Sequence, residues 1–178
     1  ELTHQRGKYV AIEYGIESVY DATLSHVNRG HNFATAVSAI AQTKAAGIDA
    51  GAHFILGLPN ETTANIIEGV ERINSLGIDF VKFHQLQIYR NTALEREWRE
   101  HPERFLFSQG FGREEYASLL TEIIRRLSPH IAIERFASQA PRNLIASSPL
   151  GGIRPAELRD SIVARMRELG ATQGDLLK

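Results

Sequence analysis

The sequence predicts an α/β protein that forms part of a (β/α) barrel, with helices outside, followed by an α-rich extension. A unit of helix, glycine and strand occurs twice, 30 residues apart, and this spacing is typical of βαβ crossovers between parallel strands. Three strand-like segments are also apolar on one face and polar on the other. We place the barrel part in residues 1–92 and the extension, with one possible strand, in residues 93–178.

The composition is that of a globular protein of 178 residues, long enough for one ordinary domain with a hydrophobic core. The 20 basic residues nearly balance 21 acidic ones, so the net charge is -1. This balance excludes a general electrostatic footprint for nucleic acid. Arginine outnumbers lysine 16 to 4, and local anion sites therefore stay possible.

The chain contains no cysteine. This absence excludes disulfides, a cysteine nucleophile, a zinc–thiolate site and a cysteine-ligated iron–sulfur cluster within these residues. No apolar run approaches the roughly 20 residues that span a membrane, so we expect no membrane partner. The first residues, Glu1 to His4, show neither an initiator methionine nor a signal peptide, and we expect a cut inside a longer, cytoplasmic protein.

The repeated unit consists of Ala46–Asp49 and Leu76–Asp79, each after an amphipathic run. Gly47 and Gly77 stand where a helix ends, because glycine adopts the left-handed conformation at little cost. The alternative is a chance similarity of two short triplets, and the helical periodicity around both argues against it. The residues expected on the buried stripes are Phe33, Val37, Ile40 and Ala41 in the first run and Ile66, Val70 and Ile73 in the second.

The three expected strands cover residues 8–16, 49–56 and 79–88. In each, apolar side chains alternate with Glu, His, Lys or Gly. An antiparallel sheet with one wet face would show this alternation, but the crossovers favour parallel strands. We therefore expect a curved sheet or barrel whose polar inner face holds a ligand.

The extension begins with a capping-box pattern, Thr92-x-x-Glu95, before a charged helix that ends near Pro102. A strong helix is expected over residues 112–127, a further strand over 130–136 and a long loop over 137–153. Pro155 and Gly170 frame a last helix, whose expected buried residues are Leu158, Ile162, Met166 and Leu169.

Four polar motifs stand at strand ends, before the second helix or on the polar face. They are Glu17-Ser18, Asn28-Arg29-Gly30-His31, the run from His53 to Thr62 and Lys82-Phe83-His84. Barrels of parallel strands place their sites at the carboxyl ends of the strands, which favours a site interpretation. Each motif also has a structural interpretation: Ser18 as a helix N-cap, Arg29 as a solvated side chain, the Gly57-Leu58-Pro59 run as a common strand-to-helix turn and His84 as a hydrogen-bonded core residue.

Glu17, His53 and His84 could together bind a metal, as in a metal-dependent hydrolase of the TIM-barrel type. No closely spaced pair of ligands supports this alternative, and we expect no metal-binding residues.

Together these motifs resemble the radical S-adenosylmethionine (radical SAM) superfamily. Gly57-Leu58-Pro59-Asn60-Glu61-Thr62 resembles its Gly-Leu-Pro-Gly-Glu-Thr run, and His53-x-Ile55-x-Gly57 resembles its Gly-x-Ile-x-Gly strand with His53 replacing the first glycine. Asn91-Thr92-Ala93-Leu94 resembles its Gly-Thr-x-Leu. One group of uncharacterised bacterial radical SAM proteins, described as Fe–S oxidoreductases, is similar over nearly the whole chain. The segments that carry this narrower resemblance are Asn28-Arg29-Gly30-His31, Lys82-Phe83-His84-Gln85-Leu86, Glu134-Arg135-Phe136 and Gln173-Gly174. The resemblance implies a partial TIM-type barrel, here the C-terminal half of a (β/α)6 core.

The resemblance also implies roles for particular residues in binding SAM. Glu17 and Ser18 would contact the methionine and ribose parts, and Arg29 would bind the carboxylate. Ile55 and Gly57, with His53, would lie against the adenine. Lys82 and His84 would face the substrate or the polar groups of SAM. No catalytic residue is assigned.

The superfamily's cluster-binding cysteines are absent, so the resemblance implies a chain that lacks the N-terminal part of its parent. The parent would cleave SAM reductively at a [4Fe-4S] cluster and generate a 5′-deoxyadenosyl radical, with a flavodoxin or ferredoxin type protein as reductant. The cluster cannot be ligated by this chain, which we expect to be inactive alone. The substrate is not indicated.

A second interpretation is an RNA-binding or tRNA-modifying module. Relatives within the superfamily, such as tRNA methylthiotransferases and the Elongator catalytic subunit, act on RNA. Arg125, Arg126, Arg135 and Arg142 could bind phosphate, although arginines on a helix face are usually solvated and the net charge is close to zero.

Overall fold

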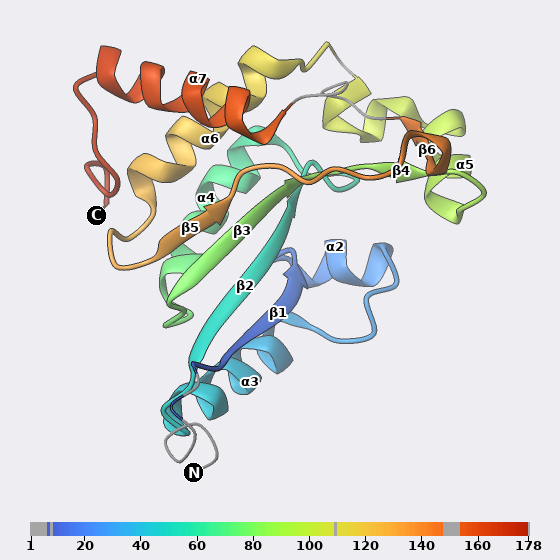
Figure 1. Ribbon diagram of the computed structural model, residues 1–178. Helices are drawn as coiled ribbons and strands as arrows, with labels where there is room; N and C mark the ends of the chain where they lie inside the picture. Colours follow the sequence, from blue (N-terminus) through green and yellow to red (C-terminus); the bar gives the residue numbers. More distant parts are fainter. Residues whose placement is uncertain (1–6, 8, 109, 148–153, 178) are drawn as a thin grey trace.

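Four parallel strands form the main sheet of the computed structural model, in the order β1-β2-β3-β5 (Figure 1). The structure describes residues 7, 9–108, 110–147 and 154–177. The strands are β1 (Ala11–Glu17), β2 (Asp49–Leu56), β3 (Phe80–Gln85), β4 (Ile88–Tyr89), β5 (Ala132–Arg135) and β6 (Ile145–Ser147). The helices are α2 (Asp21–His26), α3 (Phe33–Ala45), α4 (Thr63–Asn74), α5 (Ala93–Glu100), α6 (Arg113–Arg126) and α7 (Pro155–Glu168), and short 3-10 turns lie at Pro102–Arg104, Leu106–Ser108 and Arg142–Leu144.

The parallel order follows from the crossovers. Helix α3 connects β1 to β2, α4 connects β2 to β3, and α6 precedes β5, so each strand returns in the same direction beside the previous one. This confirms the predicted α/β class with a parallel sheet. The predicted strand at 130–136 is present as β5, and it pairs with β3, so the region after residue 92 contributes to the same sheet.

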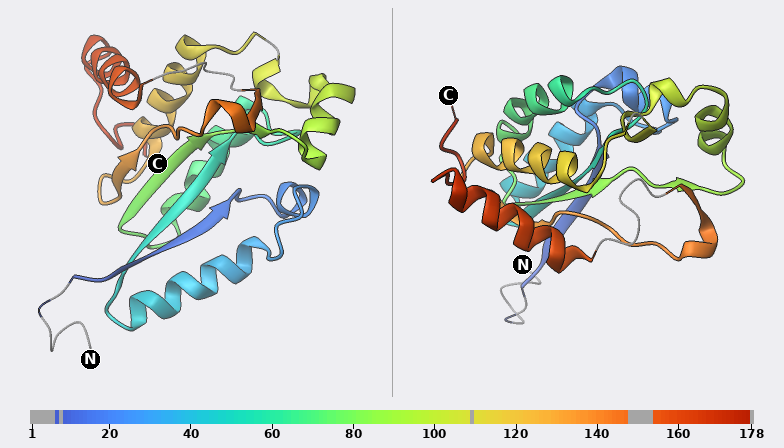
Figure 2. Two further views of the ribbon diagram at one scale, coloured as in Figure 1. Left: turned by 45° about the vertical axis from the view of Figure 1, so that its right-hand side comes forward. Right: turned by 90° about the horizontal axis from the view of Figure 1, so that it is seen from above.

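The hydrophobic core lies on one face of the sheet, where α3, α4 and α6 pack (Figure 2). Phe54 and Phe83 point into this core from β2 and β3, and both are almost completely buried. Helix α6 provides the largest buried set of apolar side chains: Tyr116, Leu119, Leu120, Ile123, Ile124 and the cap residue Leu127. The strand residues that alternate with these core-facing side chains point to the opposite, polar face.

Both glycines of the repeated unit end a helix, as predicted. Gly47 follows α3 with φ 72° and Gly77 follows α4 with φ 71°. A Cβ at either position would have no atom of the described chain within 4 Å. The backbone conformation rather than close packing therefore requires glycine there.

Some predicted burial was wrong. Val37 and Ala41 are exposed on α3, whose buried face instead carries Phe33, Ala36, Ile40 and Thr43. Leu169 lies after α7 and is 55% exposed, because the helix ends at Glu168. These errors concern residues at the margin of a stripe or beyond a helix end, where periodicity discriminates least.

The predicted strand over 79–88 is shorter, because β3 ends at Gln85 and Ile88–Tyr89 form the separate strand β4. Strand β4 pairs antiparallel with β6. Strand β6 lies inside the region 137–153, which was predicted as a loop. Residues 148–153 of that predicted loop, and Lys8 at the predicted start of the first strand, lie outside the described residues. Among the helices of the described part, none is both long and apolar enough to cross a membrane.

Candidate site at the strand ends and the open sheet face

The carboxyl end of β1 brings together two of the predicted site residues. Glu17 has a left-handed backbone, with φ 73°, next to an irregularity in the pairing of β1 with β2. A non-glycine residue in this region is strained, and such strain is concentrated at functional sites. Arg29 Nη2 donates to the carbonyl oxygen of Gly15 at 2.5 Å and lies 3.5 Å from Glu17 Oε1.

The electrostatics of this pair favour a bound polar group. Burial raises the pKa of Glu17, while the charges of Arg29, His53 and His31 act in the opposite direction. Arg29 Nε is buried and has no hydrogen-bond partner among the described residues. Burying an N–H donor without an acceptor costs free energy, and an oxygen atom of a ligand that accepted from Arg29 Nε would offset this cost.

Arg29 also lines a cleft of about 350 Å³ between α2 and α3. The cleft is formed by the loop predicted as a site motif, Asn28 to His31, together with Asp21 and Asn32. Asp21 holds the start of α3 by accepting the Phe33 backbone N–H at 2.7 Å. The loop is therefore fixed at both of its ends by helices.

Ser18 is buried, and its hydroxyl is engaged within the chain. Its Oγ donates to Glu61 Oε1 at 2.5 Å and accepts the backbone N–H of Tyr20 at 3.1 Å. Ser18 is not the N-cap of α2, because that position is Tyr20. A contact from a ligand to Ser18 would therefore have to use the remaining acceptor lone pair of this hydroxyl.

Glu61 is a residue of this site that the sequence did not assign, although it stands in the Gly57–Thr62 run. It is 8% exposed, and its carboxylate accepts the Ser18 hydroxyl from the end of β1. Burial raises its pKa, against the lowering effect of hydrogen bonds from Ser18 and Thr23. Glu61 thus joins the ends of β1 and β2.

Three further predicted residues lie together on the open face of the sheet. Strand register places His53 of β2 opposite Lys82 of β3, and the rings of His53 and His84 have centroids 5.4 Å apart. Glu13, which the sequence did not assign, contacts both His53 and Lys82. Alternation along the strands predicted this face, but the contacts across it involve residues 40 and 69 positions apart.

His84 is a neutral imidazole at physiological pH. Burial and the positive charges of His53, Arg135 and Lys82 lower its pKa to about 4. Its Nε2 is buried without a hydrogen-bond partner in the described part of the chain. Within that part, Arg29 and His84 are thus two predicted residues that each carry an unpaired buried nitrogen.

Ile55 lies near the end of β2 and Gly57 in the turn that follows it, and both are next to apolar side chains. Ile55 packs against the cluster of Leu58, Leu86, Ile88 and Phe105. Gly57 has φ 85°, and a Cβ there would lie 2.3 Å from the Phe107 ring. The glycine is therefore required both by the turn and by the ring of Phe107.

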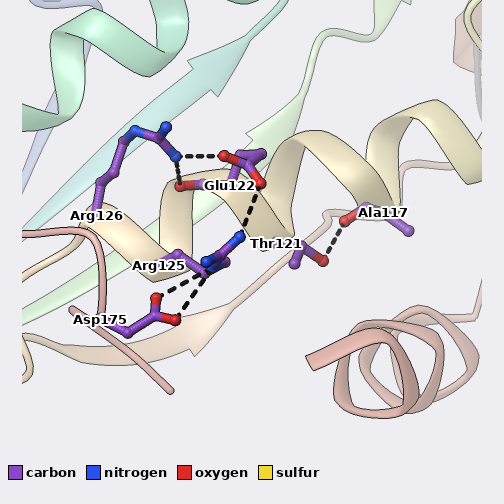
Figure 3. Close-up of polar contacts among 6 residues, drawn as sticks. All are labelled: Ala117, Thr121, Glu122, Arg125, Arg126 and Asp175. Carbon is purple, nitrogen blue, oxygen red and sulfur yellow. Dashed lines mark hydrogen bonds and ion pairs between the residues drawn. The ribbon is translucent and has the colours of Figure 1, made fainter. Parts of the chain in front are cut away.

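The structure bears differently on the metal and the RNA alternatives. Across the described residues, no group of three or more His, Cys, Asp or Glu side chains could hold a metal ion, so Glu17, His53 and His84 do not form such a site. Arg125 contacts Asp175 at 3.1 Å and Glu122 at 3.4 Å, and Arg126 also pairs with Glu122 (Figure 3). These two arginines are paired within the chain, whereas Arg135 and Arg142 are exposed.

A family model described as the Radical_SAM C-terminal domain matches residues 78–168. The chain is 29% identical to Protein YhcC of Escherichia coli K12 over 137 residues, which cover 77% of this chain and 43% of that protein. It is 27% identical to Uncharacterized protein MJ0486 of Methanocaldococcus jannaschii over 170 residues, 96% of this chain and 51% of that protein. Elongator complex protein 3 of Saccharomyces cerevisiae is 26% identical over 168 residues, which cover 93% of this chain and 28% of that protein.

The solved structure of archaeal Elp3 from Methanocaldococcus infernus, with an N-terminal deletion, superposes with a TM-score of 0.77. At 18% identity over 96% of this chain and 38% of that chain, this match shows a shared fold. The chain spans about half the length of the first curated relatives. These matches confirm the predicted resemblance and the α/β fold.

Proposed function

Because this chain belongs to the Radical_SAM C-terminal domain family, we propose that it is the SAM-binding C-terminal half of a radical SAM enzyme's barrel. The observation that carries the proposal is the pair of Glu17 and Arg29 at the end of β1, with Arg29 Nε buried and unpaired among the described residues. A guanidinium beside a partly buried carboxylate can bind a zwitterionic amino-acid group, with Arg29 on the carboxylate and Glu17 on the ammonium.

The donor set fits SAM but not the iron–sulfur cluster. Arg29 and His84 each offer a buried nitrogen that no described residue pairs with, and the strand ends supply a carboxylate and apolar contacts. The cluster would require cysteine ligands, and the sequence has none. We therefore propose that residues other than these 178 bind the cluster. The reductant protein would be a separate protein that serves that cluster.

In the parent protein, bound SAM would supply the hydrogen-abstracting chemistry typical of the superfamily after an electron from the cluster has cleaved it, and this chain's own residues would bind and orient it. Arg29 fixes the amino-acid end near β1. Ile55, beside the turn at Gly57, provides an apolar surface for the adenine. Lys82 donates hydrogen bonds on the open face, where the substrate would lie, and neutral His84 donates or accepts there.

The test is SAM binding by the longer protein that contains this chain, reconstituted anaerobically with iron and sulfide. Arg29→Ala is expected to weaken SAM binding about tenfold or more, because a hydrogen bond to a charged group contributes about 1.5–3 kcal/mol. Arg29→Lys should recover part of the loss, and Arg159→Ala, on the exposed face of α7, should bind like the wild type.

Wild-type affinity in Arg29→Ala would contradict the assignment of the carboxylate site. The 178-residue chain alone is expected to bind SAM weakly and to show no turnover. A stoichiometric, chelator-sensitive cluster on this polypeptide would overturn the proposal as a whole.

An RNA substrate is the second candidate, favoured by the similarity to Elongator complex protein 3. The exposed Arg135 and Arg142 would contact phosphate, because Arg125 and Arg126 are already paired. RNA affinity that falls steeply with salt and decreases in an Arg135→Ala, Arg142→Ala double variant would support this candidate. An absence of binding at low salt would exclude it.

A further inference from the structure

Glu13 lies in the middle of β1, on the open face, and its carboxylate reaches two other strands. Its Oε1 accepts a hydrogen bond from Lys82 Nζ of β3, and its Oε2 lies 3.1 Å from His53 Nε2 of β2. Lys82 and His53 are two of the residues proposed above to face the ligand. One carboxylate therefore fixes two ligand-facing side chains.

Lys82 is held on both sides. Its Nζ also lies 3.1 Å from Glu134 Oε2 of β5, and its side chain is only 15% exposed. An ammonium group has three N–H donors; Glu13 accepts from one of them, and Glu134 lies within ion-pair distance. Even if Glu134 takes a second donor, one N–H is available for an oxygen atom of a ligand. Neutral His84, two residues along β3, adds no competing positive charge.

Of the two carboxylates, Glu13 is the better placed to control the position of Lys82. Its side chain is 33% exposed, against 45% for Glu134, and it reaches Lys82 across β2, where it also contacts His53. Strand β1 then carries both Glu13 and Glu17, so one strand organises the open face and the Arg29 site.

We propose that Glu13 is a positioning residue, whose carboxylate holds the Lys82 ammonium and the His53 ring over the open face so that the remaining Lys82 N–H can donate to an acceptor oxygen of the substrate. This inference rests on the proposed function, because that proposal makes the open face the ligand-binding face.

The experiment measures lysine reactivity in the chain itself. Reductive methylation with formaldehyde, followed by mass spectrometry, reports each of the four lysines separately. Lys44, which is paired with Asp79 at 2.6 Å near the amino ends of β2 and β3, is the internal reference. Glu13→Gln should raise the labelling rate of Lys82 about threefold, the size expected for a partly exposed ion pair, and leave Lys44 unchanged.

The matched control is Glu71→Gln, an exposed residue of α4, which should change neither lysine. Glu13→Asp keeps the charge and should preserve most of the protection, which a purely steric role would not predict. If Glu13→Gln unfolds the chain, Lys44 labelling rises as well, and Glu13→Asp then decides the question: a small rise in Lys82 labelling alone supports the proposal, and wild-type labelling of Lys82 overturns it. Unchanged Lys82 labelling in folded Glu13→Gln would overturn the proposal, and an increase in Glu134→Gln would then assign the hold on Lys82 to Glu134.

The outcome is separable from that of the proposed function. Lys82 protection is measured without SAM, whereas the Arg29 variants are measured by SAM affinity. Altered Lys82 labelling together with wild-type SAM affinity in Arg29→Ala would support the role of Glu13 in holding Lys82 and contradict the SAM site. Unchanged Lys82 labelling in Glu13→Gln together with weakened SAM binding in Arg29→Ala would support the SAM site and contradict the role of Glu13.

Discussion

Glu61 places a carboxyl group inside the molecule, and its burial links stability to pH. The folded state raises the pKa of this group above its ordinary value, so the folded chain binds the proton more tightly than the unfolded chain. The free energy of unfolding should therefore fall as pH rises from the ordinary pKa of glutamate through the raised one.

Glu61→Gln removes this dependence and keeps an oxygen that can accept the Ser18 hydroxyl. We expect the variant to gain stability relative to the wild type as pH rises from about 4.3, the ordinary glutamate pKa. Urea unfolding at a series of pH values measures the difference. A difference that stays constant with pH would contradict the expectation, and Glu71→Gln, which changes an exposed glutamate of α4, controls for the loss of one charge.

At the level of single residues, alternation along the strands predicted which side chains share the open face, including His53, Lys82 and His84. It could not predict their partners. The contacts of Glu13 and Glu61 join residues 40 to 69 positions apart, and the register that creates them depends on strand pairing rather than on local sequence.

Among the elements, the pairing of β2 with β3 depends on a small residue at Gly51. The Phe80 ring lies over this glycine, and a Cβ would be 2.0 Å from Phe80 Cε2. Gly51→Ala should displace the ring and reduce the free energy of unfolding by about 1–3 kcal/mol, the range of an overpacked core.

Thermal or urea unfolding checks this value. Gly30→Ala is the control, because no described atom lies within 4 Å of its Cβ position, and we expect a change of no more than about 0.5 kcal/mol. A Gly51→Ala variant as stable as the wild type would mean that the Phe80 ring moves aside freely.

The elements with strong periodicity and clear boundaries were predicted well. Helix α6, from Arg113 to Arg126, and the glycine stops at Gly47 and Gly77 follow from local physics. The pair of β4 and β6 was missed, because strands of two and three residues are too short to show an alternating pattern.

In the whole molecule, the last residues return to α6 and complete its C-terminal end. Leu176 and Gly174 donate their backbone N–H groups to the carbonyls of Arg125 and Ile124 at 2.7 and 3.1 Å. Gln173 Nε2 donates to the carbonyls of Ser128 and Ile131, and Asp175 pairs with Arg125 (Figure 3). The Arg125 carbonyl near the helix end thereby gains a partner, and the Ile124 carbonyl, which already accepts the Leu127 N–H, gains a second one.

Removal of residues 172–178 should lower the free energy of unfolding by about 2–5 kcal/mol, because the four hydrogen bonds named above are lost. Asp175→Asn, which removes only a partly exposed ion pair, should cost at most about 1 kcal/mol. Urea unfolding of both variants compares the two. A truncation no more harmful than Asp175→Asn would show that the backbone contacts contribute little.

The order of the parallel strands was predictable, since consecutive βα units place neighbours side by side. The return of the C-terminal segment to α6 was not, because Thr172 to Leu177 carry no periodic pattern and bind through backbone groups.

The left-handed backbone of Glu17 has a consequence for protein engineering. Glycine or asparagine would relieve the strain at φ 73°, and a search for stabilising substitutions would select them at this position. Either change would also delete the carboxylate that faces Arg29. Any gain in robustness at this residue would thus be obtained at the expense of the proposed cofactor site, and stability screens of this chain should leave Glu17 unchanged.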